Sequence, residues 1–407
     1  MENTEREQKY LGKKGLIALL ALLSAFVPLS MDMYLPALPG MATFFNVPVS
    51  LVNLTLVLFF VFFAAGILVW GPLSDRYGRR PVLLAGLTIY VIASVLCACS
   101  SDIYQLIAFR IFQAIGGSAA SAVATAIVKD VYRSREREWI LAIVQSMVMI
   151  SPALAPAIGA FLLAFTSWRG VFWGLALIGL AALAGSVAYR ETIARRSDVS
   201  IPQSLGRLGV VLKNPGFTAL LALFSMTSVA TMAYVASSSY VFQEEFGTSA
   251  QAYSFYFAIN GVGLLLGPML YVRLSARFRR DAIIRACFAT IAASGVLVFF
   301  LGSLSPLAFT FCILPATVAG VCSRPPGTNL MLEQQKEDTG SASSLMGCSM
   351  TVMGTVGMLL VSVDTGNIIP TLGVIVAATG LVSSAGWLVI SDKTFIRQIP
   401  DDATGDR

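Results

Sequence analysis

The strongest constraint on this chain is a series of long apolar segments that recur along all 407 residues. An α-helix rises about 1.5 Å per residue, so about twenty apolar residues cross the roughly 30 Å hydrocarbon core of a bilayer. Hydrophobic residues make up 56% of the chain and charged residues only 12%, whereas soluble proteins have fewer of the first and more of the second. The sequence therefore predicts an all-α polytopic membrane protein.

Twelve segments are long and apolar enough to be transmembrane helices. The polar stretch before the first segment lacks the small-residue cleavage site of a signal peptide, so we expect that segment to be retained. The predicted spans cover residues 16–38, 50–71, 81–100, 104–127, 139–165, 168–189, 215–240, 250–271, 282–302, 306–330, 340–363 and 367–390.

The charges in the connections predict the orientation of the chain. Nearly all Lys and Arg residues lie in alternate connections and in the two terminal tails, which is the pattern of cytoplasmic loops. The other connections contain one basic residue, Arg169, and the acids Asp102, Glu244, Glu245 and Asp364. Both termini are therefore predicted to be cytoplasmic. The net charge of +6 follows from this pattern and implies no nucleic-acid partner.

The longest connection, 190–214, divides the spans into six plus six. The stretch GPLSDRYGRR (71–80) follows the second span, and GPMLYVRLSARFRR (267–280) follows the second span of the second half. This shared position favours a duplicated six-helix unit, an architecture of transporters with a central site between the halves. The predicted organisation is a tail (1–15), a six-helix bundle (16–189), a linker (190–214), a second six-helix bundle (215–390) and a tail (391–407).

Asp32 is the only acid inside an apolar segment. A charge there costs at least about 2.5 to 3.5 kcal/mol, which makes it a candidate functional residue. Arg110 in the fourth span lies at about the same depth, roughly 9 Å below the outer boundary. We therefore predict a salt bridge between Asp32 and Arg110 that offsets much of the burial cost. A carboxyl group in this setting suits proton coupling, because burial favours its neutral form and a nearby arginine favours its charged form. A purely structural ion pair is the alternative.

Several motifs identify a family resemblance. They are Gly71, Leu73, Asp75, Arg76, Gly78, Arg79 and Arg80 after the second span, Arg110, Gln113 and Gly116 in the fourth span, and the stretches SMDMYLPALP, KDVY, SPALAPAIGA and GSASSLMG. With these motifs the chain resembles the major facilitator superfamily (MFS), and within it the twelve-helix drug/proton antiporters of the bicyclomycin and chloramphenicol resistance branch. The resemblance covers nearly the whole chain.

The resemblance implies a gating role for the loop after the second span. Asp75 would lie near the start of the eleventh span, residues 339–341, where a carboxylate is favoured by the positive end of a helix. Arg76 and Arg79 would reach Asp130 at the end of the fourth span. Together these contacts would form a latch between the two halves that breaks when the cytoplasmic side opens. Its residues would be Gly71, Asp75, Arg76, Gly78, Arg79, Arg80 and Asp130. The second half has no aspartate at the matching place, so a single latch is expected. Alternatively, these charges only set the topology.

The fifth span contains Pro152, Pro156 and Gly159. The prolines interrupt the backbone hydrogen bonds of the helix, and small residues allow close approach of another helix. The resemblance implies packing against the eighth span, at Gly261, Gly263 and Gly267. A kinked helix without a special role is the alternative. The eleventh span is interpreted in the same way, through Gly347, Gly354 and Gly357.

A substrate pocket is predicted from polar, aromatic and methionine side chains in the spans that line the pore of the family fold. Such walls suit loosely matched apolar ligands, although any one of these residues could equally be ordinary packing. Arg324, beside two prolines in the tenth span, could extend to the cytoplasmic face or attract an anionic group. The pocket residues are Met33, Tyr34, Asn53, Gln113, Met147, Met149, Tyr234, Tyr256 and Asn260.

Other classes of protein are disfavoured. No GxxxxGK[ST] loop for a primary pump occurs, and the chain has no histidine. Its six cysteines suggest neither a disulfide framework nor a zinc site. We therefore expect no enzyme, no metal and no cofactor. The expected function is proton-driven export of small amphipathic drugs, such as amphenicols, by a monomer in the bacterial inner membrane. Organic cations fit the pocket no better than neutral compounds. The alternative function is proton-coupled transport of a physiological metabolite.

Overall fold

The computed structural model describes residues 8, 10–132, 134–193, 201–335, 339–363, 366–391 and 393. Across these ranges all regular structure is helical. Eleven helices of the described chain are long and apolar enough to cross a membrane, or twelve if a bent first pair forms one span. The all-α membrane fold is therefore confirmed. Asp364 and most of the two predicted tails lie outside the described residues.

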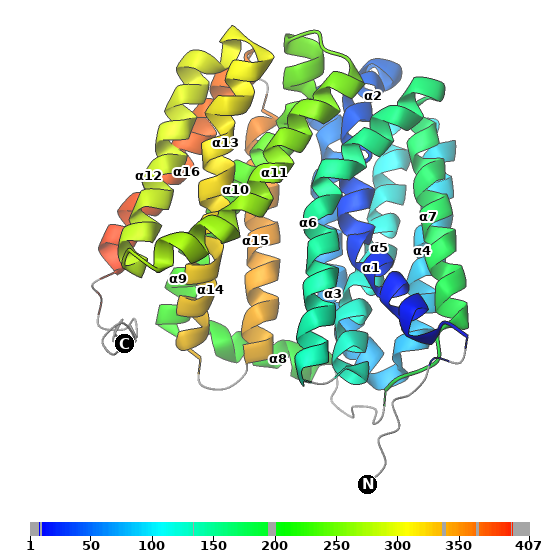
Figure 1. Cartoon of the computed structure of the whole chain (residues 1–407). Coiled ribbons are helices and arrows are strands. Elements are labelled where there is room, and N and C mark those ends of the chain that lie inside the picture. Colours follow the sequence, from blue (N-terminus) through cyan, green and yellow to red (C-terminus); the bar gives the residue numbers. More distant parts are fainter. Residues whose placement is uncertain are drawn as a thin grey trace. The chain divides into compact units, whose positions relative to one another are not determined.

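The chain divides into two compact units, of which the first comprises Met1–Ser204 and Thr248–Ala258. Its long helices lie side by side as a bundle (Figure 1). The start of α11 belongs to this unit although it follows the predicted linker in sequence. The helices are α1 (Gly12–Asp32), α2 (Leu38–Phe45), α3 (Val49–Tyr77), α4 (Arg79–Cys99), α5 (Ile103–Val131), α6 (Ser134–Phe165) and α7 (Trp168–Ala188).

The first predicted span is bent, whereas a continuous helix over 16–38 was expected. The segments Gly12–Phe26 and Pro28–Phe45 meet at an angle of 43°. Pro28 explains the bend, because a proline inside a helix removes a backbone hydrogen bond and clashes with the preceding turn. Helix α1 ends at Asp32, and a short 3₁₀ turn (Leu35–Ala37) leads into α2. Asp32 therefore occupies a helix end in the interior of the unit.

Helices α4 and α5 pack with their backbones in close contact. A Cβ atom on Gly116 would lie 2.5 Å from the backbone nitrogen of Tyr90 and 2.6 Å from the carbonyl oxygen of Gly86. Only a residue without a side chain allows this approach. Because small residues let helices contact each other closely in a membrane, this contact fixes the position of α5 and of the polar side chains on it.

The second unit comprises Leu205–Gly247 and Ile259–Arg407. The seventh and tenth predicted spans are each interrupted once, at Met226 and at Ser323, and the predicted linker contains the helix α8. Neither break was predicted, nor was α8. The helices are α8 (Ile201–Leu212, whose first turn belongs to the first unit), α9 (Pro215–Ser225), α10 (Thr227–Tyr240) with a π-helical turn (Val241–Glu245), the remainder of α11 (Ala250–Ser275), α12 (Arg280–Leu301) with a 3₁₀ turn (Gly302–Leu304), α13 (Pro306–Cys322), α14 (Arg324–Glu333), α15 (Thr339–Val361) and α16 (Ile368–Ile390).

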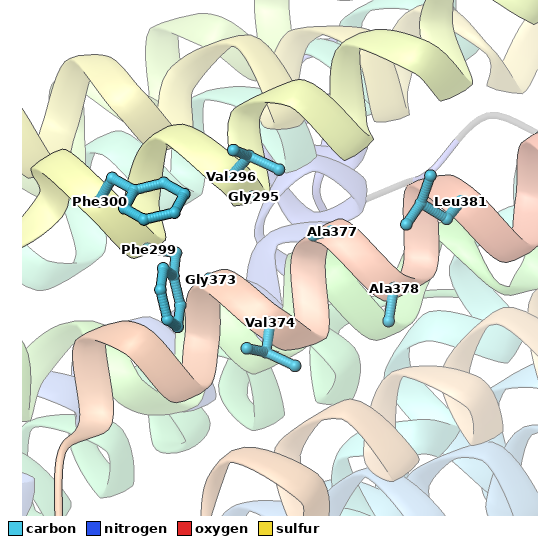
Figure 2. Close-up of a pocket in the computed structure, with 9 residues that line it drawn as sticks. All are labelled: Gly295, Val296, Phe299, Phe300, Gly373, Val374, Ala377, Ala378 and Leu381. Carbon is cyan, nitrogen blue, oxygen red and sulfur yellow. The ribbon is translucent and has the colours of Figure 1, made fainter.

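Small residues also join α12 and α16. A Cβ atom on Gly295 would lie 2.1 Å from the backbone nitrogen of Ala377. Beside this contact lies an apolar groove of about 350 Å³. Figure 2 shows its lining residues on α12 and α16, with Phe299 beside Gly373. The same physical device, glycine against backbone, thus assembles helix pairs in both units.

Candidate functional site

Arg110, near the start of α5, is 0% exposed, although no acid in the described part of the chain forms an ion pair with it. Its Nη1 donates to the carbonyl oxygen of Ser30 at 3.2 Å and to Oε1 of Gln113 at 2.7 Å. Its Nη2 lies 3.2 Å from the sulfur of Met31. The guanidinium group is therefore held by polar groups of α5 itself and of the end of α1.

Three aromatic rings surround the same guanidinium group. Its central carbon lies 4.2 Å from the ring centroid of Phe59, 4.8 Å from that of Tyr34 and 5.9 Å from that of Phe172. A cation over the face of an aromatic ring is stabilised by about 0.5 to 2 kcal/mol, and most strongly where water is excluded. The rings therefore supply part of the stabilisation that a carboxylate would otherwise provide.

A chain of hydrogen bonds extends this cluster to α4. Gln113 donates through Nε2 to the hydroxyl of Ser94 at 2.8 Å, and that hydroxyl donates to the carbonyl oxygen of Tyr90 at 2.7 Å. The hydroxyls of Tyr90 and Ser30 are 2.6 Å apart. Helices α1, α4 and α5 are thus joined by one buried polar network. Gln113, predicted to bind substrate, is an internal member of this network.

The predicted salt bridge between Asp32 and Arg110 is wrong. Asp32 is 8% exposed, and within the described part of the chain it forms no ion pair. The prediction assumed a straight first span, but the span bends at Pro28. Arg110 instead contacts the carbonyl oxygen of Ser30 and the sulfur of Met31. The side chains of adjacent helix positions such as Met31 and Asp32 point in different directions. Asp32 is therefore a buried carboxyl group without a counter-charge.

The other predicted pocket residues near Asp32 are packed inside the first unit. The hydroxyl of Tyr34 is 2.8 Å from that of Thr55 on α3. Met33 is buried, and its sulfur-bound methyl group lies 3.7 Å from an ideal Cβ position on Gly174 of α7. Gly159 of α6 approaches the carbonyl oxygen of Met33 so closely that a Cβ there would be 2.0 Å away. Gly159 thus has the predicted role in helix packing, with α1 as its neighbour.

The remaining predicted pocket residues are divided between the units. In the first unit Asn53 is buried on α3, Tyr256 and Met149 are half-buried, and Met147 is exposed. In the second unit Tyr234 and Asn260 are both buried. The structure gives the burial of each side chain within its own unit. A pocket shared by all of them stays a prediction.

Packing between the fifth and eighth predicted spans is confirmed, but through different residues. The hydroxyl of Ser254 on α11 donates to the carbonyl oxygen of Pro156 on α6 at 2.9 Å, and Gln251 donates to Ala160 at 3.2 Å. Gly263 was predicted to make this contact. Positions nine apart lie on opposite faces of a helix, so Gly263 and Ser254 face in opposite directions from α11.

The glycines of α11 approach α13 instead. A Cβ on Gly263 would lie 2.8 Å from Leu314, and one on Gly267 would lie 2.9 Å from Val321. In the eleventh predicted span, α15, Gly357 has the expected packing role, because a Cβ there would lie 2.1 Å from the carbonyl oxygen of Val229 on α10. Gly354 packs on the same helix. Gly347 does not, because no described atom lies within 4 Å of its ideal Cβ.

Arg79 is the centre of the loop after α3. It begins α4 and is buried, and its Nη1 is 2.5 Å from Oδ1 of Asp75 and 2.7 Å from the hydroxyl of Ser74. Its Nε is 2.8 Å from Oδ2 of Asp130 at the end of α5. The predicted contact between Arg79 and Asp130 is confirmed. Arg76, which was expected to share it, lies over the ring of Tyr77 at 5.6 Å.

The second unit contains a corresponding ion pair. Arg280 begins α12 as Arg79 begins α4, and its Nη1 lies 2.9 Å from Oε1 of Glu333 at the end of α14. The single latch stays a prediction, but this helix-to-helix ion pair was not predicted. A comparison of the two loops alone overlooked it, because the acid comes from the far end of another helix. Only the contact between Asp75 and Arg79 has no counterpart, because alanine (Ala276) occupies the position four residues before Arg280.

Glu191 also binds the loop after α3, and this role was not predicted from the sequence. Its carboxylate accepts hydrogen bonds from the backbone N–H groups of Arg79 and Arg80, at 3.1 and 2.9 Å, and from the two residues that follow it. A Cβ on Gly78, whose φ is +112°, would lie 2.6 Å from this carboxylate. Gly78 therefore provides both the turn and the space. The only signal in the sequence is an acid directly after the sixth span.

Two other residues of the predicted latch have simpler surroundings. Arg80 donates through Nη2 to the carbonyl oxygen of Val187 at 2.8 Å. Gly71 has no described atom within 4 Å of its ideal Cβ. Arg324 begins α14 directly after the break at Ser323, and its Nε is buried without a described partner. Both interpretations of Arg324 therefore stay open.

Comparison with known proteins shows the family. Residues 20–358 match the model of the Major Facilitator Superfamily. The chain belongs to this superfamily. It is therefore a transporter, and its bundles of membrane helices are those of an MFS protein. The fold is also that of a solved bacterial homologue of the human lysosomal transporter Spinster, with a TM-score of 0.75 at 15% identity over 94% of this chain and 98% of that one.

Three relatives of this MFS transporter indicate its branch. An uncharacterized MFS-type transporter of Bacillus subtilis, YdgK, is 30% identical over 93% of this chain and 96% of its own length. A chloramphenicol resistance protein of Pseudomonas aeruginosa is 42% identical over 43% of this chain and 42% of its own. A bicyclomycin resistance protein homolog of Haemophilus influenzae is 24% identical over 88% of this chain and 91% of its own. These similarities support the drug-exporter branch of the MFS.

Glutamine in place of Glu191 is expected to destabilise the transporter at neutral pH. Burial alone would raise the pKa of this carboxyl group, but the four backbone N–H donors outweigh it and hold the pKa below its ordinary value. Glutamine carries no charge and offers one acceptor oxygen. We expect a loss of about 1 kcal/mol, the usual magnitude for a helix cap.

The pH dependence tests the charge. A lowered folded-state pKa stabilises the protein above the unfolded-state pKa of about 4.3, and this contribution disappears as the pH falls through the folded-state value. Thermal unfolding at pH 7.5 should therefore separate Glu191→Gln from the parent protein, and unfolding near pH 4 should bring them together. Glu245→Gln, at an exposed position, is the control. An equal difference at both pH values would contradict the charge argument.

Proposed function

We propose that this MFS transporter is a proton-coupled exporter of small amphipathic drugs, such as amphenicols or bicyclomycin-like compounds, with Asp32 as the protonation site. One observation carries the proposal: the only acid in the apolar segments is buried at a helix end and has no described ion-pair partner. No counter-charge holds the carboxyl group in one form. A proton and a polar group of a substrate can therefore compete for it.

Arg110 is proposed to couple this competition to conformation. It contacts the carbonyl oxygen of Ser30 and the sulfur of Met31, which directly precede Asp32. A change of charge at Asp32 therefore acts on a helix end that is fastened to α4 and α5 through the buried polar network. We propose that the loop around Arg79, with its partners Asp75 and Asp130, opens and closes in the same cycle.

The energetics are sufficient for export. One proton that enters the cell supplies about 2.3 kcal/mol per 100 mV of membrane potential and about 1.4 kcal/mol per pH unit. With one proton per neutral substrate, this supports a gradient on the order of a hundredfold or more. The proposed location is the bacterial inner membrane, with both termini in the cytoplasm and the monomer as the working unit.

Substrate-induced proton release tests the mechanism. Purified protein in unbuffered detergent solution is titrated with chloramphenicol and, separately, with a lipophilic cation, and the pH is recorded. We expect protons to be released as substrate binds, and no release from Asp32→Asn. Demonstrable binding without any release by the unsubstituted protein would contradict direct competition at Asp32.

A second candidate is proton-coupled transport of a physiological metabolite, such as an amino-acid-like solute. The buried Nε of Arg324, which has no described partner, favours a substrate with an anionic group. Titration with carboxylate metabolites in the same assay separates the two functions, because a drug exporter should not respond to them.

A further inference from the structure

Two cysteines of the second unit lie close together although they are far apart in the sequence. Cys287 lies in the second turn of α12, and Cys322 is the last residue of α13. Both side chains line the same cavity between α12 and α13. Both residues are largely buried, at 6% and 1% exposed. They form a pair of neighbouring thiols, a dithiol, in the second unit, whereas Asp32 and Arg110 belong to the first.

The dithiol borders a cavity of about 390 Å³ between α11, α12 and α13. The other side chains around the cavity are apolar, with Thr290 as the one polar exception. An apolar volume next to two thiols can accept an apolar group attached to a thiol-binding atom. The remaining lining residues are Leu270, Leu274, Ile283, Ala286, Leu314, Pro315, Val318 and Ala319.

The packing of the three helices holds the two thiols together. The hydroxyl of Ser294, two turns along α12 from Cys287, donates to the carbonyl oxygen of Cys312 on α13. On the other side, a Cβ on Gly267 of α11 would lie 3.0 Å from the backbone nitrogen of Cys322. The backbone at Cys322 is thus fixed by a close contact, and the separation of the thiols follows from the fold.

The chemistry of the pair selects a soft ligand. Thiolate sulfur prefers soft metal and metalloid centres over hard cations. In the described residues no group of three or more His, Cys, Asp or Glu side chains could hold a metal ion, so a centre that binds two sulfur atoms fits better than one that requires four. Trivalent arsenic with one organic substituent meets both conditions, because the substituent can occupy the apolar cavity.

We propose that Cys287 and Cys322 form a binding site for trivalent organic arsenicals. In the reaction two S–As bonds form and the two As–O bonds of the dihydroxyarsine break. The two thiol protons leave with the two hydroxyl groups as two water molecules, and no atom changes its oxidation state. The proposal does not depend on the transported substrate, since both cysteines lie in the second unit and Asp32 in the first.

Phenylarsine oxide is the probe. Purified full-length protein in detergent is freed of reductant, treated with the probe, and analysed by intact mass spectrometry and thiol titration. We expect a gain of one phenylarsenic group per chain, a loss of two titratable thiols, and reversal by ethanedithiol. Cys287→Ser and Cys322→Ser should each lose the adduct. Cys312→Ser should keep it, because Cys312 does not line the cavity.

Peptide mapping of the unsubstituted protein keeps the test independent of variant folding. The arsenic atom should link the peptides that contain Cys287 and Cys322. An adduct that persists in both serine variants, an adduct on single cysteines, or unchanged thiols after treatment would each overturn the proposal.

Discussion

Asparagine in place of Asp32 abolishes drug export driven by an imposed pH gradient, while the protein still folds. The substitution keeps the shape of the side chain and removes the only acid in the apolar segments. Without a proton to exchange, the gradient of a neutral substrate should collapse from about tenfold per unit of imposed pH difference to about one. Transport into inverted proteoliposomes, with and without a pH gradient, measures this directly.

Asp102→Asn is the matched control for this experiment. Asp102 precedes α5, and its carboxylate accepts hydrogen bonds from the N–H groups of Tyr104 and Gln105. Asparagine caps a helix about as well as aspartate, so the substitution should change little. If Asp32→Asn retained accumulation driven by the pH gradient, coupling would have to reside elsewhere, and Asp32 would be a structural residue.

Alanine in place of Gly116 should destabilise the protein severely, although it adds a single methyl group. That group would lie 2.5 Å from the backbone nitrogen of Tyr90 and 2.6 Å from the carbonyl oxygen of Gly86. Backbone atoms cannot rotate away, so α4 and α5 must separate. The buried network of Arg110 joins the same two helices and would be disturbed as well. We expect a loss of about 3 kcal/mol, the upper part of the range for overpacking.

Gly117→Ala is the control at the next position of the same helix. Its methyl group would lie 3.3 Å from the nearest atom, which belongs to the ring of Tyr90 and can shift slightly. Alanine also favours helix over glycine by about 1 kcal/mol. Thermal unfolding in detergent, followed by size-exclusion chromatography, should therefore show a much lower midpoint for Gly116→Ala alone. Equal midpoints would contradict the close contact of the two helices.

The membrane-spanning segments could be predicted because their signal is local. A run of about twenty apolar residues satisfies its own backbone as a helix and matches the bilayer, whatever the rest of the chain does. The bend of the first span is also local in origin, since Pro28 is visible in the sequence, but its size and direction are not. The prediction about Asp32 failed at this point.

Contacts between distant residues were predicted less well. The contact between Arg79 and Asp130 was predicted correctly, and that prediction came from the family resemblance. Glu191 was missed because its partners are backbone N–H groups, which no residue type reveals. Gly263 was assigned to the wrong neighbour, because small residues indicate close packing without indicating the helix on which they pack.

The sequence by itself determined the class of this protein, its membrane segments and the singular position of Asp32 as an acid among apolar residues. Each of these depends on composition and on spacing along the chain. Only the tertiary structure decided that carbonyl, sulfur and aromatic groups surround Arg110, that Glu191 caps α4, and that Cys287 and Cys322 line one cavity. These contacts depend on how helices far apart in sequence pack and on which way each side chain points, and packing of whole helices sets both.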